Sequence, residues 1–159
     1  MGAQAESRAH LRKAREFLVA ARLEAERDLY TAAASSAVLA GINAKDAIRL
    51  RLTGRTSKAD AHRSAVSELA AAGPAGKALE PTFRRLLSLK TAAQYQSAPI
   101  SRTDATKAVD WATRMVDAAA DLTKARGSAQ RHTLSRRTIQ AEKSTTVVAA
   151  LPRTNGPCW

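Results

Sequence analysis

The sequence predicts an all-α protein, an up-and-down bundle of about five helices with a basic, partly disordered C-terminal tail. Three observations support this fold class. Apolar residues recur at helical spacing through most of the chain. Alanine, the best helix former, is abundant, while aromatic residues make up only 4% of the sequence. No stretch before the tail shows the alternation of a strand, and short breaker segments separate five helical stretches.

The first two helices are predicted over residues 6–27 and 30–52. The first is amphipathic, and His10 lies beside its apolar stripe, where we interpret it as a surface or flanking residue. The second carries no charge in its first half, which is typical of a central, buried helix. Charged residues then arrive together, so this helix is expected to emerge from the core at its C-terminal end. Arginines there also complement the helix dipole, which is a purely structural explanation for them.

Three further helices are predicted after Gly54, a residue suited to a helix C-terminus. The third runs from about residue 58 to 72 behind a capping-box-like start at Ser57 and Asp60. The fourth begins at Pro81, which fits the first position of a helix. The fifth follows a second capping signature, Ser101 with Asp104, and ends at about residue 126. This organisation predicts a helical bundle over residues 6–126 and a basic tail over 127–159.

Charge and composition limit the classes of function that the chain can have. The net charge is +12, which favours nucleic acid as a partner, with an anionic membrane surface second. A compositional bias toward alanine and arginine is the alternative explanation. The single cysteine excludes a disulfide framework within one chain, and the three histidines lack the spacing of a zinc site. We expect a cytoplasmic protein with no membrane segment, no metal and no cofactor.

The pair Arg55 and His62 is the candidate for chemistry, because histidine can act as an acid or base near neutral pH and arginine can brace a phosphate. Seven positions along a helix make two turns, so both side chains would project on one side if the turn winds tightly into the third helix. Asn43 and Asp46 precede the turn by about three helical turns and are candidates to face the same pocket. Other basic residues would add positive potential or bind nucleic acid, namely Arg49, Arg51, Lys58, Arg63, Arg136 and Arg137.

The string Arg55-Thr-Ser-Lys-Ala-Asp-Ala-His62, placed after the second long helix, resembles the motif of the HEPN superfamily (higher eukaryotes and prokaryotes nucleotide-binding domains). That family has bundles of four or five helices with an arginine and a histidine separated by four to six residues, and a polar residue upstream in helix two. The stretch from Leu89 to Tyr95, with the segment from Ile100 to Ala108, resembles the family's entry into its last helix. The resemblance covers about residues 6–125.

The resemblance implies metal-independent RNA cleavage at a composite site in a homodimer. His62 would be the acid and base, Arg55 would bind the phosphate, and Asn43 or Asp46 would orient them. Many relatives are toxins or phage-defence effectors, so an antitoxin or a nucleotidyltransferase is a possible partner. The branch that pairs with a nucleotidyltransferase carries a tyrosine where this chain has Ser64. The alternative is a non-catalytic helical module that binds nucleic acid or protein, including as a subunit of a larger effector complex.

Overall fold

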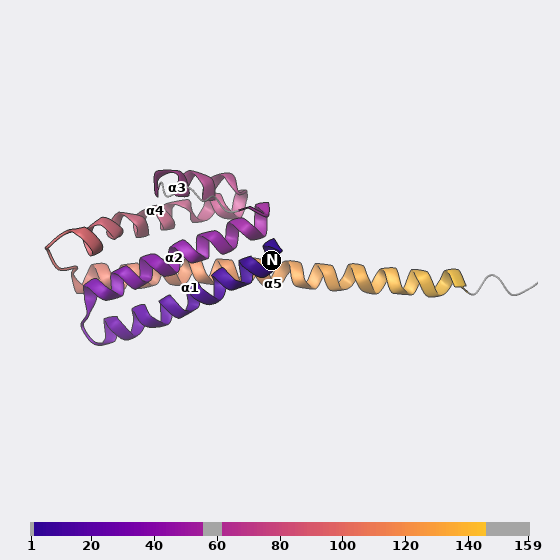
Figure 1. The fold of residues 1–159 in the computed structure, drawn as a ribbon, viewed down its shortest axis with the longest axis horizontal. Helices are drawn as coiled ribbons and strands as arrows, with labels where there is room; N and C mark the ends of the chain where they lie inside the picture. The colour runs from indigo at the N-terminus through magenta and orange to yellow at the C-terminus, as the bar shows by residue number, and fades with distance from the viewer. Residues whose placement is uncertain (1, 56–61, 146–159) are drawn as a thin grey trace, which may run out of the picture. The chain divides into compact units, whose positions relative to one another are not determined.

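The computed structural model describes residues 2–55 and 62–145, without the side chains of residues 62, 63, 95 and 126–145. The described residues form helices α1 (Ala3–Glu26), α2 (Tyr30–Thr53), α3 (His62–Ala71), α4 (Pro74–Tyr95) and α5 (Arg102–Thr145) (Figure 1). Contacts divide the chain into two compact units, Met1–Lys124 and Ala125–Trp159. The all-α prediction is confirmed, and every element in the described part is a helix.

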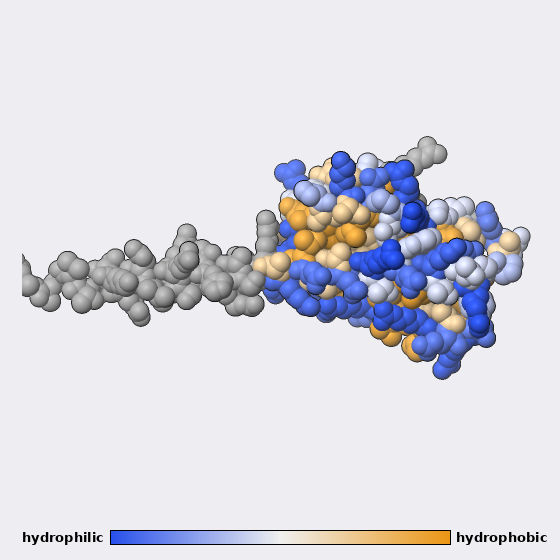
Figure 2. All heavy atoms as spheres, turned by 180° about the vertical axis from the view of Figure 1, so that it is seen from behind, coloured by the Kyte–Doolittle hydropathy of each residue, from blue (hydrophilic) through white to orange (hydrophobic). Residues whose placement is uncertain are grey.

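Helix α2 is the centre of the first unit because almost every turn of it is buried. Its small residues let neighbouring helices approach closely, and Ala33, Ala37 and Ala44 are fully buried. At Gly41 an added Cβ would lie 2.2 Å from Cδ2 of Leu86, so glycine lets α4 pack closely against α2 without displacing the tip of that side chain. The larger core side chains come from several helices, and the fully buried ones are Phe83, Ile48, Leu69, Leu86, Met115 and Val38. Hydrophilic residues cover most of the face seen in Figure 2.

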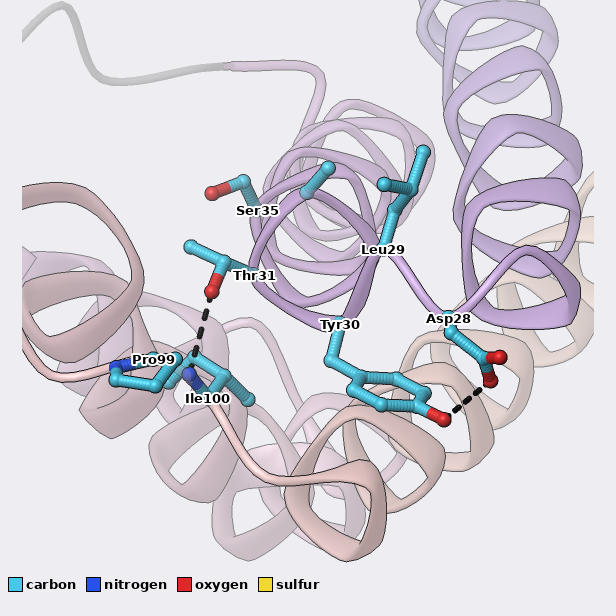
Figure 3. Close-up of a pocket in the computed structure, with 8 residues that line it drawn as sticks. Asp28, Leu29, Tyr30, Thr31, Ser35, Pro99 and Ile100 are labelled. Atoms are coloured by element: carbon cyan, nitrogen blue, oxygen red, sulfur yellow. Dashed lines mark hydrogen bonds between the residues drawn. The ribbon is translucent and has the colours of Figure 1, made fainter.

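The two ends of α2 are fixed differently. At the start, the hydroxyl of Thr31 accepts a hydrogen bond from the backbone N–H of Ile100 at 3.2 Å, which ties the loop before α5 to α2 (Figure 3). The preceding turn contains Asp28 with a positive φ of 60°, bonded to Tyr30 and Arg102. At the other end, Gly54 adopts the left-handed conformation with φ 72°, as expected for a helix C-cap.

Two predicted boundaries are wrong. Helix α4 begins at Pro74, not at Pro81. Gly73 has a φ of 126°, which interrupts the helical backbone, and Pro74 then occupies the first turn of α4. Pro81 then lies inside α4, where burial of the following Phe83 and Leu86 offsets its missing N–H. The expected end of the last helix near residue 126 is also wrong, because α5 continues to Thr145. A single Gly127 costs only about 1 kcal/mol in a helix, which is too little to end a helix by itself.

The start of α5 agrees with its sequence signature. The backbone N–H of Asp104 donates to the hydroxyl of Ser101 at 3.1 Å, and that hydroxyl donates to the Asp104 carboxylate at 2.9 Å. This is a reciprocal cap at a helix N-terminus. The similar signature at Ser57 and Asp60 lies outside the described residues. No helix in the described ranges has the length and apolar character needed to cross a bilayer.

Candidate active site at the junction of α2 and α3

Helix α3 runs in the same direction as α2, and this determines where His62 lies. Leu69 in α3 contacts Gly76 in α4 so closely that a Cβ at Gly76 would lie 2.0 Å from the Leu69 carbonyl oxygen. The two helices therefore form a tight antiparallel pair joined by Ala72 and Gly73. Helix α4 is in turn antiparallel to α2, because Leu86 lies beside Gly41 and Ile100, after α4, bonds Thr31 near the start of α2.

The consequence is that the start of α3 lies level with the middle of α2. Glu68 pairs with Arg49, and His62 is six residues before Glu68, about 9 Å back along the helix axis. This places the backbone of His62 level with about Asn43. Arg55 follows the other end of α2, so about 14 Å of helical rise separates its level from the start of α3. The prediction that Arg55 and His62 share one helical face concerns the connection 56–61 and the His62 side chain, which lie outside the described residues.

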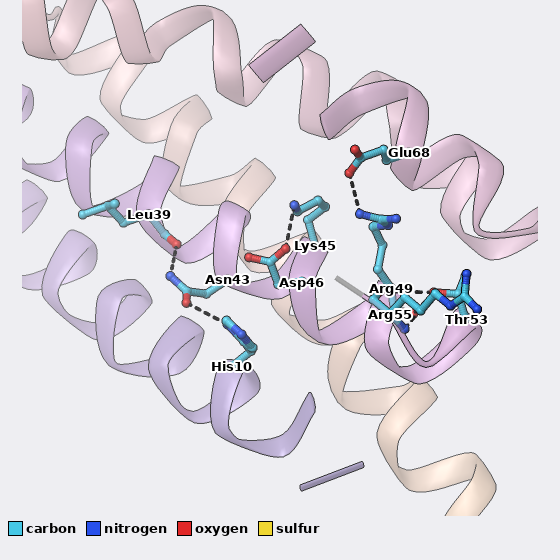
Figure 4. A network of polar contacts seen from close by, with 9 residues as sticks. All are labelled: His10, Leu39, Asn43, Lys45, Asp46, Arg49, Thr53, Arg55 and Glu68. Atoms are coloured by element: carbon cyan, nitrogen blue, oxygen red, sulfur yellow. Dashed lines mark hydrogen bonds and ion pairs between the residues drawn. The ribbon is translucent and has the colours of Figure 1, made fainter. Parts of the chain in front are cut away.

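Two ion pairs lie on the side of α2 that faces α3 (Figure 4). Lys45 Nζ lies 2.6 Å from Asp46 Oδ1, and the Lys45 side chain is only 7% exposed. Arg49 is paired with Glu68 across the two helices, with 13% and 21% of these side chains exposed. A charge so poorly hydrated needs its partner, so both pairs fix local geometry. Asp46 and Arg49, both predicted site residues, are thus already engaged within the chain.

Asn43 faces a different neighbour. Its amide nitrogen donates to the carbonyl oxygen of Leu39 at 2.8 Å, which fixes the orientation of the amide. Its Oδ1 lies 3.2 Å from Nδ1 of His10 and must be the acceptor, so this ring nitrogen carries the proton (Figure 4). Asn43 is 7% exposed and joins α2 to α1, whereas Arg49 joins α2 to α3. The structure does not bring these two predicted residues together.

The remaining predicted cations differ in exposure. Arg55 is exposed, and its backbone N–H donates to the Thr53 hydroxyl at 3.2 Å. Arg51 is only 8% exposed and its Nε donates to the carbonyl oxygen of Leu122 in α5 at 3.1 Å. Lys58 and the side chains of four other predicted residues lie outside the described part, namely His62, Arg63, Arg136 and Arg137.

Sequence reasoning missed two participants. His10 was expected at the surface, yet it is half-buried against Asn43. Its spacing of three and four residues from the buried Ser7 and Ala14 was the available signal. Lys45 was treated as part of a charged helix end, and only the position of α3 explains its burial. Within residues 2–55 and 62–145, no group of three or more His, Cys, Asp or Glu side chains is placed to hold a metal ion.

Comparison with known proteins agrees with the resemblance noted in the sequence. The search of curated proteins finds no match. A family model described as the HEPN domain matches residues 7–122, a range that covers most of α1, all of α2 to α4, the first part of α5, and both Arg55 and His62. The match covers more than half of the chain, and every described element within it is a helix. The chain therefore belongs to the HEPN domain family.

Proposed function

We propose that this protein is a metal-independent endoribonuclease that works as a homodimer, with a toxin or phage-defence role. The observation that carries the proposal is the HEPN match over residues 7–122, because it spans the Arg55–His62 motif and the helices on both sides. The charge of +12 supports a polyanionic substrate.

In the proposed reaction, the 2′-oxygen of RNA attacks the adjacent phosphorus and the bond to the 5′-oxygen breaks. The products are a 2′,3′-cyclic phosphate and a free 5′-hydroxyl. One proton leaves the 2′-hydroxyl and one is delivered to the 5′-oxygen, and His62 is the group that exchanges protons with the substrate. Arg55 binds the phosphate and stabilises the charge that develops on its oxygens.

The separation of Arg55 and His62 along α2 supports a specific version of the composite site. The two residues lie at different levels of one bundle, and a two-fold dimer of antiparallel bundles brings Arg55 of one subunit to His62 of the partner subunit. Each dimer then contains two equivalent sites. Asp46 and Lys45, level with the start of α3, orient the site, while Asn43 holds α1 and α2 in register.

The second candidate is a non-catalytic module that binds nucleic acid or a protein partner, including as a subunit of a larger effector complex. A specific observation favours it: Asn43, Asp46 and Arg49 are all occupied by contacts within the chain. On that interpretation these residues only hold the helices, and binding depends steeply on salt because phosphate contacts dominate.

The two candidates are separated by incubating the purified protein with RNA in excess EDTA. The nuclease proposal predicts cleavage by the parent, loss of at least about 100-fold in His62→Ala, and parent-like cleavage by His132→Ala, a histidine outside the matched region. Circular dichroism checks that each variant is folded. Absence of cleavage by the parent, or equal cleavage by His62→Ala, contradicts the proposal and leaves the binding module.

A further inference from the structure

A shallow groove runs along the seam between α1 and α5, within the unit Met1–Lys124. Leu11 and Ala120 form its apolar floor, and the hollow has a volume of about 300 Å³. The two helices are antiparallel here, since the guanidinium of Arg22 donates to the hydroxyl of Thr113 at 3.1 Å further along the same seam. The groove is thus a feature of helix packing rather than of a loop.

Four cations line this groove, namely Arg8, Arg12, Arg15 and Lys124. All four are exposed, and in the described part of the chain none of them makes an ion pair or a side-chain hydrogen bond. No acidic residue is among the described residues that line the groove. The nearest acids by helical spacing are Glu16 on α1 and Asp117 and Asp121 on α5, which are exposed outside the lining. The groove therefore concentrates positive charge without internal compensation.

The spacing of the cations matches a linear polyanion. Arg8, Arg12 and Arg15 follow one face of α1 at intervals of four and three residues, so they rise by about 10 Å in total. At about 3.4 Å per phosphate along a stacked strand, this length corresponds to roughly three phosphates. Lys124 adds a charge from the opposite wall. A compact anion would contact only one or two of these side chains.

We propose that the α1–α5 groove binds the phosphodiester backbone of single-stranded nucleic acid, and that the occupant is RNA. The choice of RNA rests on the proposed function. The described lining contains no aromatic ring to stack on a base and no side-chain amide to read one, and Thr123 supplies its only hydroxyl. Binding is therefore independent of base sequence. Neither Arg55 nor Asn43 lines the groove, so it is a docking surface separate from the candidate active site.

The test uses the full chain and a fluorescent 2′-O-methyl oligoribonucleotide, which cannot be cleaved through its 2′-oxygen. Binding is measured against salt concentration for the parent and for the triple variant Arg12→Glu/Arg15→Glu/Lys124→Glu. The matched control is Lys77→Glu/Arg85→Glu/Lys107→Glu, which changes three exposed cations outside the groove by the same total charge. Circular dichroism and thermal melting confirm that both variants are folded.

The groove variant is expected to bind the oligonucleotide at least about tenfold more weakly. The slope of log K against log salt should become shallower by about 2, because each of three lost phosphate contacts contributes about 0.7. The control keeps the parent slope, and an oligodeoxyribonucleotide of the same sequence behaves like the RNA because only phosphates are contacted. With cleavable RNA, the groove variant raises KM and keeps kcat.

Equal weakening in the two triple variants would overturn the proposal, since net charge alone would then explain binding. Absence of oligonucleotide binding by the parent would also overturn it. So would a groove variant that no longer binds phosphatidylglycerol vesicles but keeps the parent's affinity for the oligonucleotide. Cleavage by the parent with an unaffected groove variant would reject the groove and leave the proposed nuclease standing. Oligonucleotide binding that depends on the groove, without any RNA cleavage by the parent, would support the groove and reject the proposed nuclease.

Discussion

Replacing Gly76 with alanine is expected to destabilise the bundle, even though alanine is a better helix former than glycine. The new Cβ would lie 2.0 Å from the carbonyl oxygen of Leu69 and 3.1 Å from its carbonyl carbon. Both of these atoms belong to the backbone of α3, so no side-chain rotation relieves the contact. Helices α3 and α4 must therefore move apart by more than 1 Å at their closest point, given an ordinary contact distance of about 3.5 Å.

The magnitude follows from two opposing effects. Overpacking of this kind costs about 1–3 kcal/mol, and the helix propensity of alanine returns at most about 1 kcal/mol. Gly76 lies in the first turn of α4, where the propensity gain is smaller still. We expect a net loss of about 1–2 kcal/mol in the free energy of unfolding, which corresponds to a melting temperature lower by roughly 3–10 °C.

The assay is thermal and urea unfolding followed by circular dichroism at 222 nm, with two matched glycine variants. Gly2→Ala meets no atom within 4 Å, so it should lose only the preference for glycine over alanine at the N-cap of α1. Gly41→Ala meets the tip of the Leu86 side chain, which can rotate at some cost, so its effect should be intermediate. A Gly76→Ala protein as stable as the parent would refute the close backbone contact, and with it the placement of α3 that carries His62.

Three further predictions concern the core, the α2–α3 ion pair and pH. Phe83→Ala should lower the free energy of unfolding by about 3–5 kcal/mol in urea titration, because the ring is fully buried, and a loss below 1 kcal/mol would contradict that burial. A double-mutant cycle of Arg49→Ala and Glu68→Ala should give a coupling of about 1–3 kcal/mol, whereas additive effects would exclude the pair. Hydrogen bonds from Tyr30 and then Arg102 lower the pKa of Asp28, so its stabilising effect is present above pH 4 and is lost as pH falls through the lowered value. The difference in melting temperature between parent and Asp28→Asn should therefore be constant from pH 6 to 8 and decrease as the pH falls below 4; a difference that grows on acidification would oppose this assignment.

Much of the fold could be predicted because its determinants are local. The uncharged first half of α2, the reciprocal cap at Ser101 and the breaker at Gly54 are each visible within a few residues of sequence. The boundaries at Pro74 and after Gly127 were mispredicted because tertiary burial and helix continuation outweigh single breaker residues.

The candidate site was harder to predict because it depends on the direction of α3. Sequence spacing places Arg55 and His62 together only if the connection winds directly into the next helix. The close contact of Leu69 with Gly76 and the pairing of Arg49 with Glu68 instead return the start of α3 to the middle of α2. Similarly, the row of cations beside Lys124 appears only when α1 and α5 pack antiparallel, more than 100 residues apart in sequence.

The composite site makes one sharply defined measurement possible, namely RNA cleavage by a mixture of Arg55→Ala and His62→Ala proteins after subunit exchange. Each variant alone should be inactive. If Arg55 of one subunit works with His62 of the partner subunit, half of the randomly mixed dimers regain one of two sites, so about a quarter of the parent activity should return. Verified subunit exchange with no recovery of cleavage would contradict a site shared across the dimer.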